Sequence, residues 1–369
     1  MAQTPFACTR AHVLRMSLLA AASMATFWVG APAAGAAPSA ASWDTPQQRQ
    51  VIAAGLLGDS AGSFNGAGHL SAAQANSAMS ALTAHMQDTG GETGTQGEQG
   101  PEGVAGTAAA FTAPAQTAQN PVSVAAFDRL LVEELGLEPV AAHVQATAAA
   151  AGLRPPSFFG TEVVARFLEL GYEHPVGSQR LDLFPTEPIS RAQAAWSLAG
   201  VLDLSSWSVS AARESLSAFE LPPMSSAQRQ ALQIAVSRIG YPYVWGGTTD
   251  NTADGLEHGG FDCSGFAWRV YKVSGLPWGR EIGGRTAAEQ AGEIPRSQRL
   301  TAGQLEPGDL LFFGTAHFNS TATESNVTHE GIYLGDNWVI HSSGQGVYVL
   351  PLAGSWLGSS FAWGRRVIR

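Results

Sequence analysis

The chain has little cysteine, little charge and a single lysine. Two cysteines occur in 369 residues, and Lys272 is the only lysine. Cys8 precedes an N-terminal apolar run, so Cys263 is the single cysteine beyond that run. One thiol cannot form an internal disulfide. Cys263 is therefore predicted to be either an inert buried residue or a reactive one.

The balance of charge excludes one class of partner. Charged residues make up 14% of the chain, and 20 basic against 30 acidic residues give a formal net charge of −10. No basic stripe is present to neutralise the phosphates of a nucleic acid, so a nucleic-acid partner is not expected. The length exceeds the usual size of one compact domain, which predicts several domains.

Residues 1–36 have the pattern of a secretory signal peptide. Arg10 and Arg15 precede an apolar run that reaches Val29, and small residues follow it. A charged start, an apolar middle and a small-residue exit are typical of a removable export signal. A membrane anchor is the alternative, but Pro32 leaves this run too short for the ~20 residues that a span needs. We expect a secreted, cell-wall-associated protein whose mature chain has no integral membrane span.

Three segments in the first 205 residues share one pattern. Ser71, Ser123 and Ser190 each stand at an expected helix N-cap, and apolar residues at helical spacing follow each serine. Short apolar helices are expected upstream of the first and third, over Val51–Leu57 and Val163–Leu170. A repeated pattern of this length indicates one supersecondary unit that is used several times.

These units resemble degenerate S-layer homology repeats, which hold proteins on bacterial cell walls. The resemblance covers roughly residues 43–205, and the family's signature is best matched by Ser190-Arg191-Ala192-Gln193. It implies a secondary cell-wall polymer as a partner, although the first two units lack the arginine. A plain helical spacer is the alternative.

Composition places two linkers between the domains. Residues 89–119 are rich in Gly, Gln, Glu and Thr with almost no large apolar residue, which predicts a flexible linker. The repeats are therefore expected at 43–88 and 120–205. A second linker is expected at 206–226, and the last domain at 227–369.

The last domain contains the candidate nucleophile. A loop of turn formers, 248–260, leads to Asp262-Cys263-Ser264-Gly265, where a helical pattern begins. Phe266, Val270 and Val273 are expected on its buried side. The partial positive charge at a helix N-terminus favours a thiolate, so Cys263 is predicted to be reactive.

Two histidines further along the chain are the candidate partners of Cys263. Residues 328–334 and 338–342 are predicted to be strands joined by a turn at Gly335–Asn337. With Leu334 opposite Trp338, His341 lies diagonal to His329 on one face of the sheet. Diagonal neighbours are about 7–8 Å apart, within reach of a hydrogen bond between the rings. This arrangement predicts His329 as a general base and His341 as the group that orients it.

The histidines allow two other interpretations. Each one alone fits a polar residue at a strand end whose hydrogen bonds are satisfied. A metal site could use His258 and His317 together with His329 and His341, but their spacing fits no zinc pattern and only one thiol is nearby. No metal or other cofactor is predicted.

Residues 227–369 resemble the NlpC/p60 cell-wall endopeptidases, papain-like cysteine peptidases of bacterial peptidoglycan. Five motifs occur in family order: Tyr241–Gly247, Phe261–Phe266, Leu305–Phe313, His329–Gly335 and Val339–Ser343. The resemblance implies an α+β fold in which a helix bearing the cysteine packs on an antiparallel sheet. A mostly α-helical repeat region would precede this domain.

The resemblance also implies roles for individual residues. Cys263 would be the nucleophile, His329 the base and His341 the polar third member. Tyr243 would lie beside the oxyanion site, where its hydroxyl can donate a hydrogen bond. Asp262 and Ser264 stand where family members line the substrate cleft, with loop and helix capping as equal alternatives.

The implied activity is that of a secreted cysteine endopeptidase acting on the stem peptides of peptidoglycan. The bond between D-glutamate and diaminopimelate is the expected target. A non-catalytic wall-binding protein and a papain-like amidase or acyltransferase are the alternatives.

The sequence departs from the family's pattern in two ways. The segments 248–260 and 314–328 are longer than usual and could narrow or cover the cleft. Glu330 replaces the family's usual valine, on the face of the strand opposite to His329. A charge there predicts that this side of the sheet is wet.

Overall fold

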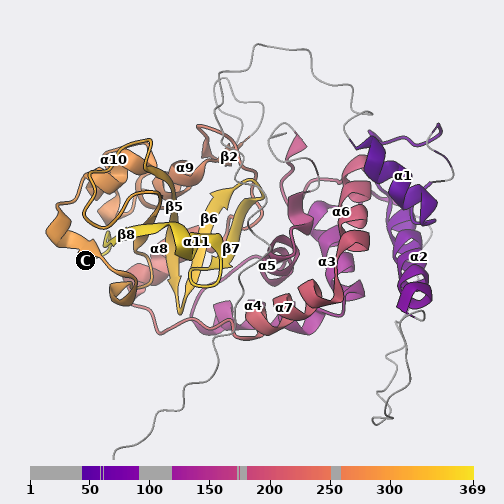
Figure 1. Ribbon diagram of the computed structural model, residues 1–369, viewed down its shortest axis with the longest axis horizontal. Coiled ribbons are helices and arrows are strands. Elements are labelled where there is room, and N and C mark those ends of the chain that lie inside the picture. Colours follow the sequence, from indigo (N-terminus) through magenta and orange to yellow (C-terminus); the bar gives the residue numbers. More distant parts are fainter. Residues whose placement is uncertain are drawn as a thin grey trace, which may run out of the picture.

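The computed structural model describes residues 44–58, 60, 62–90, 119–172, 174, 181–250 and 259–369. The predicted signal peptide, nearly all of the predicted 89–119 linker and His258 lie outside the described residues. Helices form the first half of the described chain, and helices with an antiparallel sheet form the second half (Figure 1). The α+β prediction is confirmed.

Seven α-helices and one short 3-10 helix precede residue 218 in the described part of the chain. They are α1 (Thr45–Ala53), α2 (Ala72–Gly90), α3 (Val124–Glu134), α4 (Glu138–Ala150), α5 (Phe159–Phe167), η3 (Leu170–Tyr172), α6 (Arg191–Asp203) and α7 (Ser206–Ser217). The three expected N-cap serines cap α2, α3 and α6, and the side chain of each accepts a backbone N–H three residues on, at 3.2–3.3 Å. These caps satisfy donors that a helix start leaves unpaired.

The residues just before the three caps form a closed ring of backbone hydrogen bonds. Leu70 N–H donates to Ile189 (3.0 Å), Ile189 N–H donates to Val122 (2.9 Å), and Val122 N–H donates to Leu70 (2.9 Å). All three residues are buried. Residues two positions before and after these three are joined by three more backbone hydrogen bonds. The N–H groups of Ala72, Val124 and Arg191 donate to the carbonyls of Asn120, Glu187 and Gly68, respectively. The repeated sequence pattern therefore corresponds to a backbone arrangement that is repeated three times around one centre.

The segment 206–226 differs from the predicted linker. Its first part is helix α7, which Ser205 caps and which buries Ala212 and Leu216. Phe219 is also buried, and its ring lies 5.0 Å from that of Trp338. The segment therefore packs against both halves of the molecule: α7 against the helices of the first half, and Phe219 against Trp338 of the second.

The second half is built around one antiparallel sheet. Its strands, in the order β3-β8-β4-β5-β6-β7, are β3 (Arg299–Leu300), β8 (Phe361–Arg365), β4 (Leu310–Gly314), β5 (Val327–Gly335), β6 (Trp338–Ser343) and β7 (Gly346–Pro351). A separate pair, β1 (Thr248–Thr249) and β2 (Gly260–Phe261), lies just before Cys263. The helices are α8 (Ser226–Val236), α9 (Cys263–Trp268), the π-helix η5 (Arg269–Val273), η6 (Pro277–Glu281), α10 (Ala287–Gly292), η7 (Arg296–Gln298), η8 (Ala302–Gln304) and α11 (Trp356–Ser360).

Alternation along the strands gives the sheet two different faces. Phe312 and Ile332 belong to the core on the side of α9 and α10. Leu311, Phe313 and Val339 form a smaller cluster with residues of α11 on the other side. The helix that begins with Cys263 therefore packs on an antiparallel sheet, as expected. Among the described residues, no helix combines the length and the apolar character needed to cross a membrane.

The predicted hairpin has the expected register around the histidines but a different turn. Gly331 pairs with His341, as predicted, whereas Gly335 rather than Leu334 pairs with Trp338. Asp336 and Asn337 form a two-residue turn with φ of 42° and 75°. Aspartate and asparagine tolerate this left-handed conformation, which suits tight hairpins. A register shift between Tyr333 and Gly335 reconciles the shorter turn with the predicted pairing.

The helix after Cys263 buries a different residue from the one predicted. Val273 is 48% exposed, and Tyr271 is buried instead, where its hydroxyl donates to the Gly308 carbonyl at 2.6 Å. The cause is the change from α9 to the wider turn of η5, which rotates the following side chains relative to an α-helix.

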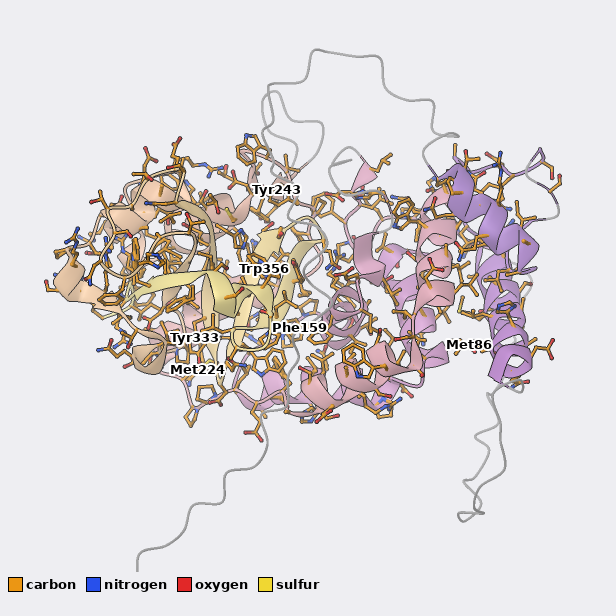
Figure 2. The ribbon with its side chains drawn as sticks, viewed as in Figure 1. Met86, Phe159, Met224, Tyr243, Tyr333 and Trp356 are labelled. Carbon is orange, nitrogen blue, oxygen red and sulfur yellow. The ribbon has the colours of Figure 1, made fainter. Side chains whose placement is uncertain are left out.

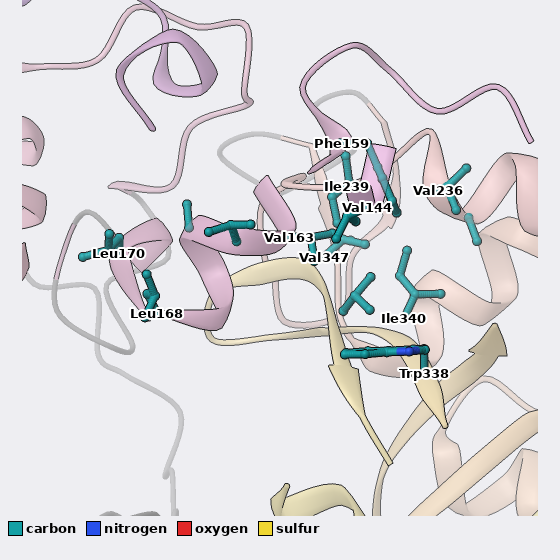
Figure 3. Close-up of a cluster of buried hydrophobic side chains, with 14 of the residues drawn as sticks. Val144, Phe159, Val163, Leu168, Leu170, Val236, Ile239, Trp338, Ile340 and Val347 are labelled. Atoms are coloured by element: carbon teal, nitrogen blue, oxygen red, sulfur yellow. The ribbon is translucent and has the colours of Figure 1, made fainter. Parts of the chain in front are cut away.

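The two halves of the described chain share one hydrophobic core. Figure 3 shows Phe159 and Val163 of α5 in the same cluster as Ile239, Ile340 and Val347 of the second half. Helix α5 lies beside β7 in the structure. The helical region is therefore packed against the sheet domain through side chains that both halves bury.

A buried ion pair reinforces this junction. Arg166 Nε lies 2.8 Å from Glu162 Oε2, and both side chains are almost fully buried. The Arg166 guanidinium also donates to the carbonyls of Gly240 (3.3 Å) and Gln345. Gly240 precedes Tyr243 by three residues, so α5 fixes the start of the segment that carries this tyrosine.

We predict that Arg166→Met lowers the free energy of unfolding by about 3–5 kcal/mol, because it leaves the Glu162 carboxylate buried without its partner. Urea unfolding would measure the loss. Arg129→Met is the matched control. Arg129 and Glu133 are also four residues apart on one helix, but the Arg129 side chain is 58% exposed. Its expected cost is within ~1 kcal/mol. Equal losses in the two variants would contradict the stabilising role of the buried Arg166–Glu162 pair.

Candidate active site

Cys263 is the first residue of α9 and lies against β5. The Asp262 side chain caps the helix by accepting the Gly265 N–H at 2.5 Å. The backbone N–H groups of Ser264 and Glu330 both face the sulfur. Because Glu330 directly follows His329, the sulfur lies beside the strand that carries the first candidate histidine. The Cys263 side chain is partly exposed.

The two histidines form the contact that the hairpin register predicted. His329 Nε2 lies 2.9 Å from His341 Nδ1, and the ring planes are nearly perpendicular, at 88°. His341 is fully buried. Its Nε2 has no hydrogen-bond partner among the described residues. The contact uses Nε2 of His329, so the other ring nitrogen, Nδ1, is not bound to His341.

Aromatic side chains enclose the histidine pair. The Trp356 ring lies 5.2 Å from that of His329 and 5.7 Å from that of His341, and Tyr348 lies 4.3 Å from His341. Figure 2 shows Trp356 over the strands of the sheet. Burial lowers the pKa of His329 to about 3 and lowers the pKa of His341 as well, so both rings are neutral at neutral pH. No motif marks Trp356 in the sequence.

The structure corrects the expectation that the helix start alone produces a thiolate. Burial, Glu330 and Asp262 raise the pKa of the Cys263 thiol to about 12, although the two backbone N–H groups favour the charged form. Desolvation here outweighs the partial charge of the helix N-terminus. In the resting site the sulfur is a neutral thiol beside neutral imidazoles.

Tyr243 belongs to a segment that is hydrogen-bonded to β2. Phe261 N–H donates to Pro242 (3.0 Å), and Val244 N–H donates to Phe261 (3.2 Å), so the two segments run side by side into the site. Burial raises the pKa of Tyr243, and Cys263 and Asp262 raise it further. The hydroxyl therefore keeps its proton and can act as a donor. Figure 2 marks Tyr243 in the sheet domain.

Asp262 and Ser264 belong to a polar network with Arg285. The guanidinium donates to both Asp262 oxygens, at 3.0 and 2.9 Å, and to Ser264 Oγ at 2.9 Å. Asp262 Oδ2 also accepts the Gly246 N–H at 2.9 Å. Asp262 thus fixes both the helix start and the loop that follows Tyr243, as in the capping interpretation. Arg285 escaped prediction because it lies outside every motif.

Glu330 contradicts the expectation of a wet sheet face. Its side chain is fully buried, and neither carboxyl oxygen has a hydrogen-bond partner in the described structure. Its neighbour across the sheet is Phe312. The expectation was wrong because α9 and α10 cover this face of β5.

The remaining candidates from the sequence lie away from this cluster or are not described. His317 is exposed, and its backbone N–H donates to Ser320 Oγ at 3.0 Å. The segment 314–328 is tied to β3 by Arg299, which donates to the carbonyls of Phe318 and Ser320 at 2.5 and 2.8 Å. Only the two ends of the segment 248–260 are described. Within the described residues, no group of three or more His, Cys, Asp or Glu could hold a metal ion.

Two solved structures each resemble part of the chain. An NlpC/P60 family protein from Bacillus cereus is 27% identical, with a TM-score of 0.30, and the match covers 41% of this chain and 42% of that one. The P60 domain of a Mycobacterium avium subspecies paratuberculosis antigen is 23% identical, with a TM-score of 0.29, and the match covers 39% of this chain and 96% of that one.

Curated relatives also match part of the chain. A probable endopeptidase of Mycobacterium tuberculosis is 33% identical over 134 residues, which are 36% of this chain and 28% of the relative. The probable peptidoglycan endopeptidase LytE of Bacillus subtilis is 34% identical over 122 residues, or 33% and 29%. The bifunctional muramidase/DL-endopeptidase CwlT of Bacillus subtilis is 32% identical over 132 residues, or 36% and 34%. The chain thus spans about a third or less of the length of these relatives.

The family comparison agrees with the fold and the motifs. Residues 240–366 match the model of the NlpC/P60 family. This range contains the whole cluster around Cys263, from Tyr243 to the histidine hairpin and Trp356. The resemblance of residues 43–205 to S-layer homology repeats stays a prediction. The C-terminal part of this chain, residues 240–366, is an NlpC/P60 domain.

Proposed function

We propose that this protein is a secreted cysteine endopeptidase that hydrolyses an amide bond in the stem peptides of peptidoglycan. The observation that carries the proposal is the hydrogen-bonded pair of His329 and His341 beside the helix that starts at Cys263. Relatives named as peptidoglycan endopeptidases support it. The bond between D-glutamate and diaminopimelate is the proposed target.

The resting protonation states define the first chemical step. The pKa of the Cys263 thiol is about 12 and that of His329 about 3, so the proton stays on sulfur until substrate arrives. As the sulfur attacks the carbonyl carbon, His329 takes its proton. His341 occupies Nε2 of His329, so Nδ1 is the nitrogen that accepts. This step requires the tautomer in which His329 Nε2–H donates to His341 Nδ1.

The remaining steps need hydrogen-bond donors to the developing oxyanion. The Tyr243 hydroxyl and the backbone N–H of Cys263 would donate to the oxyanion of the tetrahedral intermediate. His329 then gives its proton to the leaving amine, which leaves a thioester between the acyl group and Cys263. Water, activated by His329, releases the acid and restores the thiol.

We also propose that the helical repeats hold the enzyme at the cell wall. The backbone ring around Leu70, Val122 and Ile189 supports a compact, repeated module. The shared core and Arg166 join this module firmly to the peptidase domain. A wall contact made by the repeats would therefore set the orientation of the cleft.

We predict that Cys263→Ala abolishes cleavage of muropeptides, because it removes the thiol that would form the acyl intermediate. Mass spectrometry of digested peptidoglycan would show both the loss and the bond that the unaltered protein cleaves. An unchanged thermal unfolding midpoint would show that the variant is folded. Full activity in the folded variant would refute the proposal, whereas release of ammonia without cleavage of the stem would indicate an amidase.

Tyr243→Phe is expected to lower kcat on the order of 10²-fold, since one donor to the oxyanion is lost. Steady-state hydrolysis of a purified stem peptide measures the effect. Alkylation of Cys263 by iodoacetamide serves as the control, because that reaction forms no oxyanion. A parallel loss of alkylation would indicate that Tyr243 supports the nucleophile instead.

His341→Ala is expected to leave partial activity. The variant keeps the base and the nucleophile and loses only the group that orients His329 and shares its proton. We expect kcat to fall while KM changes little, because His341 is buried behind His329. Activity as low as that of Cys263→Ala would show that His341 is itself indispensable to the chemistry.

A further inference from the structure

Glu330 is a carboxyl group inside the apolar layer beneath Cys263. It points to the face of β5 that α9 and α10 cover, and it is fully buried. Neither of its oxygens has a hydrogen-bond partner among the described residues. Two other buried polar side-chain atoms in this domain also lack a partner among the described residues, Gln290 Oε1 on α10 and Trp363 Nε1 on β8.

The charged groups around Glu330 are already paired. Arg285, from the loop before α10, binds Asp262 at the start of α9. Arg365, from β8, binds Glu293 just after α10, with 2.6 Å between Nη1 and Oε2. On β6, the buried hydroxyl of Ser342 donates to the Phe261 carbonyl at 2.7 Å.

An unpaired carboxylate at such a position is strongly disfavoured. The pKa of Glu330 is raised to about 8: burial is the largest cause and the charge of Asp262 adds to it, while Arg365 and Arg285 offset only part of the increase. The protonated, neutral form of Glu330 is therefore the resting form at neutral pH.

Glu330 is also coupled to the sulfur. Its backbone N–H faces Cys263, and its carboxyl lies in the layer on which α9 rests. A thiolate and a carboxylate this close would be like charges in a medium of low dielectric constant, where their repulsion is strong. Ionisation of one group therefore opposes ionisation of the other.

We propose that Glu330 is a positioning residue that governs the charge of Cys263: the neutral carboxyl permits the sulfur to ionise, and the carboxylate suppresses it. This inference rests on the proposed role of Cys263 as the nucleophile. Glu330 acts through the sulfur and touches no substrate. Once Glu330 ionises, a further rise in pH increases the thiolate fraction of Cys263 less than it would for a thiol without this neighbour.

The test is the pH profile of Cys263 alkylation by iodoacetamide in the full-length protein and in Glu330→Gln, which keeps the shape of the side chain but cannot ionise. At neutral pH the two rates are expected to agree. At about pH 9 the variant is expected to react about tenfold faster, which corresponds to one pKa unit of the thiol. Superimposable profiles for the two proteins would overturn the proposal.

Two further proteins make the result specific. Glu330→Val carries the apolar residue usual in the family and is expected to follow the Glu330→Gln profile. Glu306→Gln removes a glutamate whose side chain is 56% exposed and is expected to follow the unaltered protein. Because iodoacetamide needs no peptide substrate, the alkylation profile tests Glu330 even if no peptidoglycan bond is cleaved. If the alkylation profiles of Glu330→Gln and the unaltered protein differ as expected but the unaltered protein hydrolyses no muropeptide, only the proposed function is contradicted.

Thermal unfolding gives an independent readout with a definite sign. In the folded protein the pKa of Glu330 is about 8, above that of an unfolded glutamate, which is about 4.3. The free energy of unfolding therefore falls as pH rises from about 4.3 to about 8. Glu330→Gln should unfold at nearly the same temperature as the unaltered protein at about pH 4.5 and at a higher temperature near pH 8. A temperature difference independent of pH would show that Glu330 is already charged in the folded protein, and the proposal would fail.

Discussion

Desolvation of the ionisable side chains around Cys263 is the constraint on which this site depends. The Cys263 thiol belongs to α9 and the Glu330 carboxyl faces α9 and α10, whereas the two imidazoles lie against Trp356 of α11 on the other face of the sheet. Burial disfavours the charged form of every one of them. These four groups are therefore neutral at rest, and under the proposed function charge would develop on them only when a substrate carbonyl arrives. Reactivity would then come from the arrangement of proton donors and acceptors rather than from a stored ion pair.

The helical half of the molecule takes part in holding this arrangement. Helix α5 shares its core with Ile239, Ile340 and Val347, and Arg166 donates to the backbone carbonyls of Gly240 and Gln345. The chain from Gly240 to Tyr243 is thus anchored at one end by the helical region and at the other by β2. A structural unit that the sequence presents as a separate module is physically continuous with the NlpC/P60 domain.

Local sequence patterns predicted the elements that depend on short-range physics. Serine caps, the Cys263 helix start and the pairing of Gly331 with His341 follow from neighbouring residues, and each is present. The errors arose where distant segments decide the outcome. Helix α7 and Phe219 pack against residues far along the chain, and the π-turn of η5 moves Tyr271 into the core. Arg285 and Trp356 reach the site from segments without a motif.

The sequence by itself determined the family of the C-terminal domain, the identity of its thiol and the face of the sheet shared by two histidines, because spacing along a helix or hairpin fixes such relations. Only the tertiary structure decided which groups lose water. It placed Glu330 under α9, enclosed His329 and His341 with aromatic rings, and thereby set the protonation states of the site. Desolvation depends on everything that packs around a group, and no local pattern of residues contains that information.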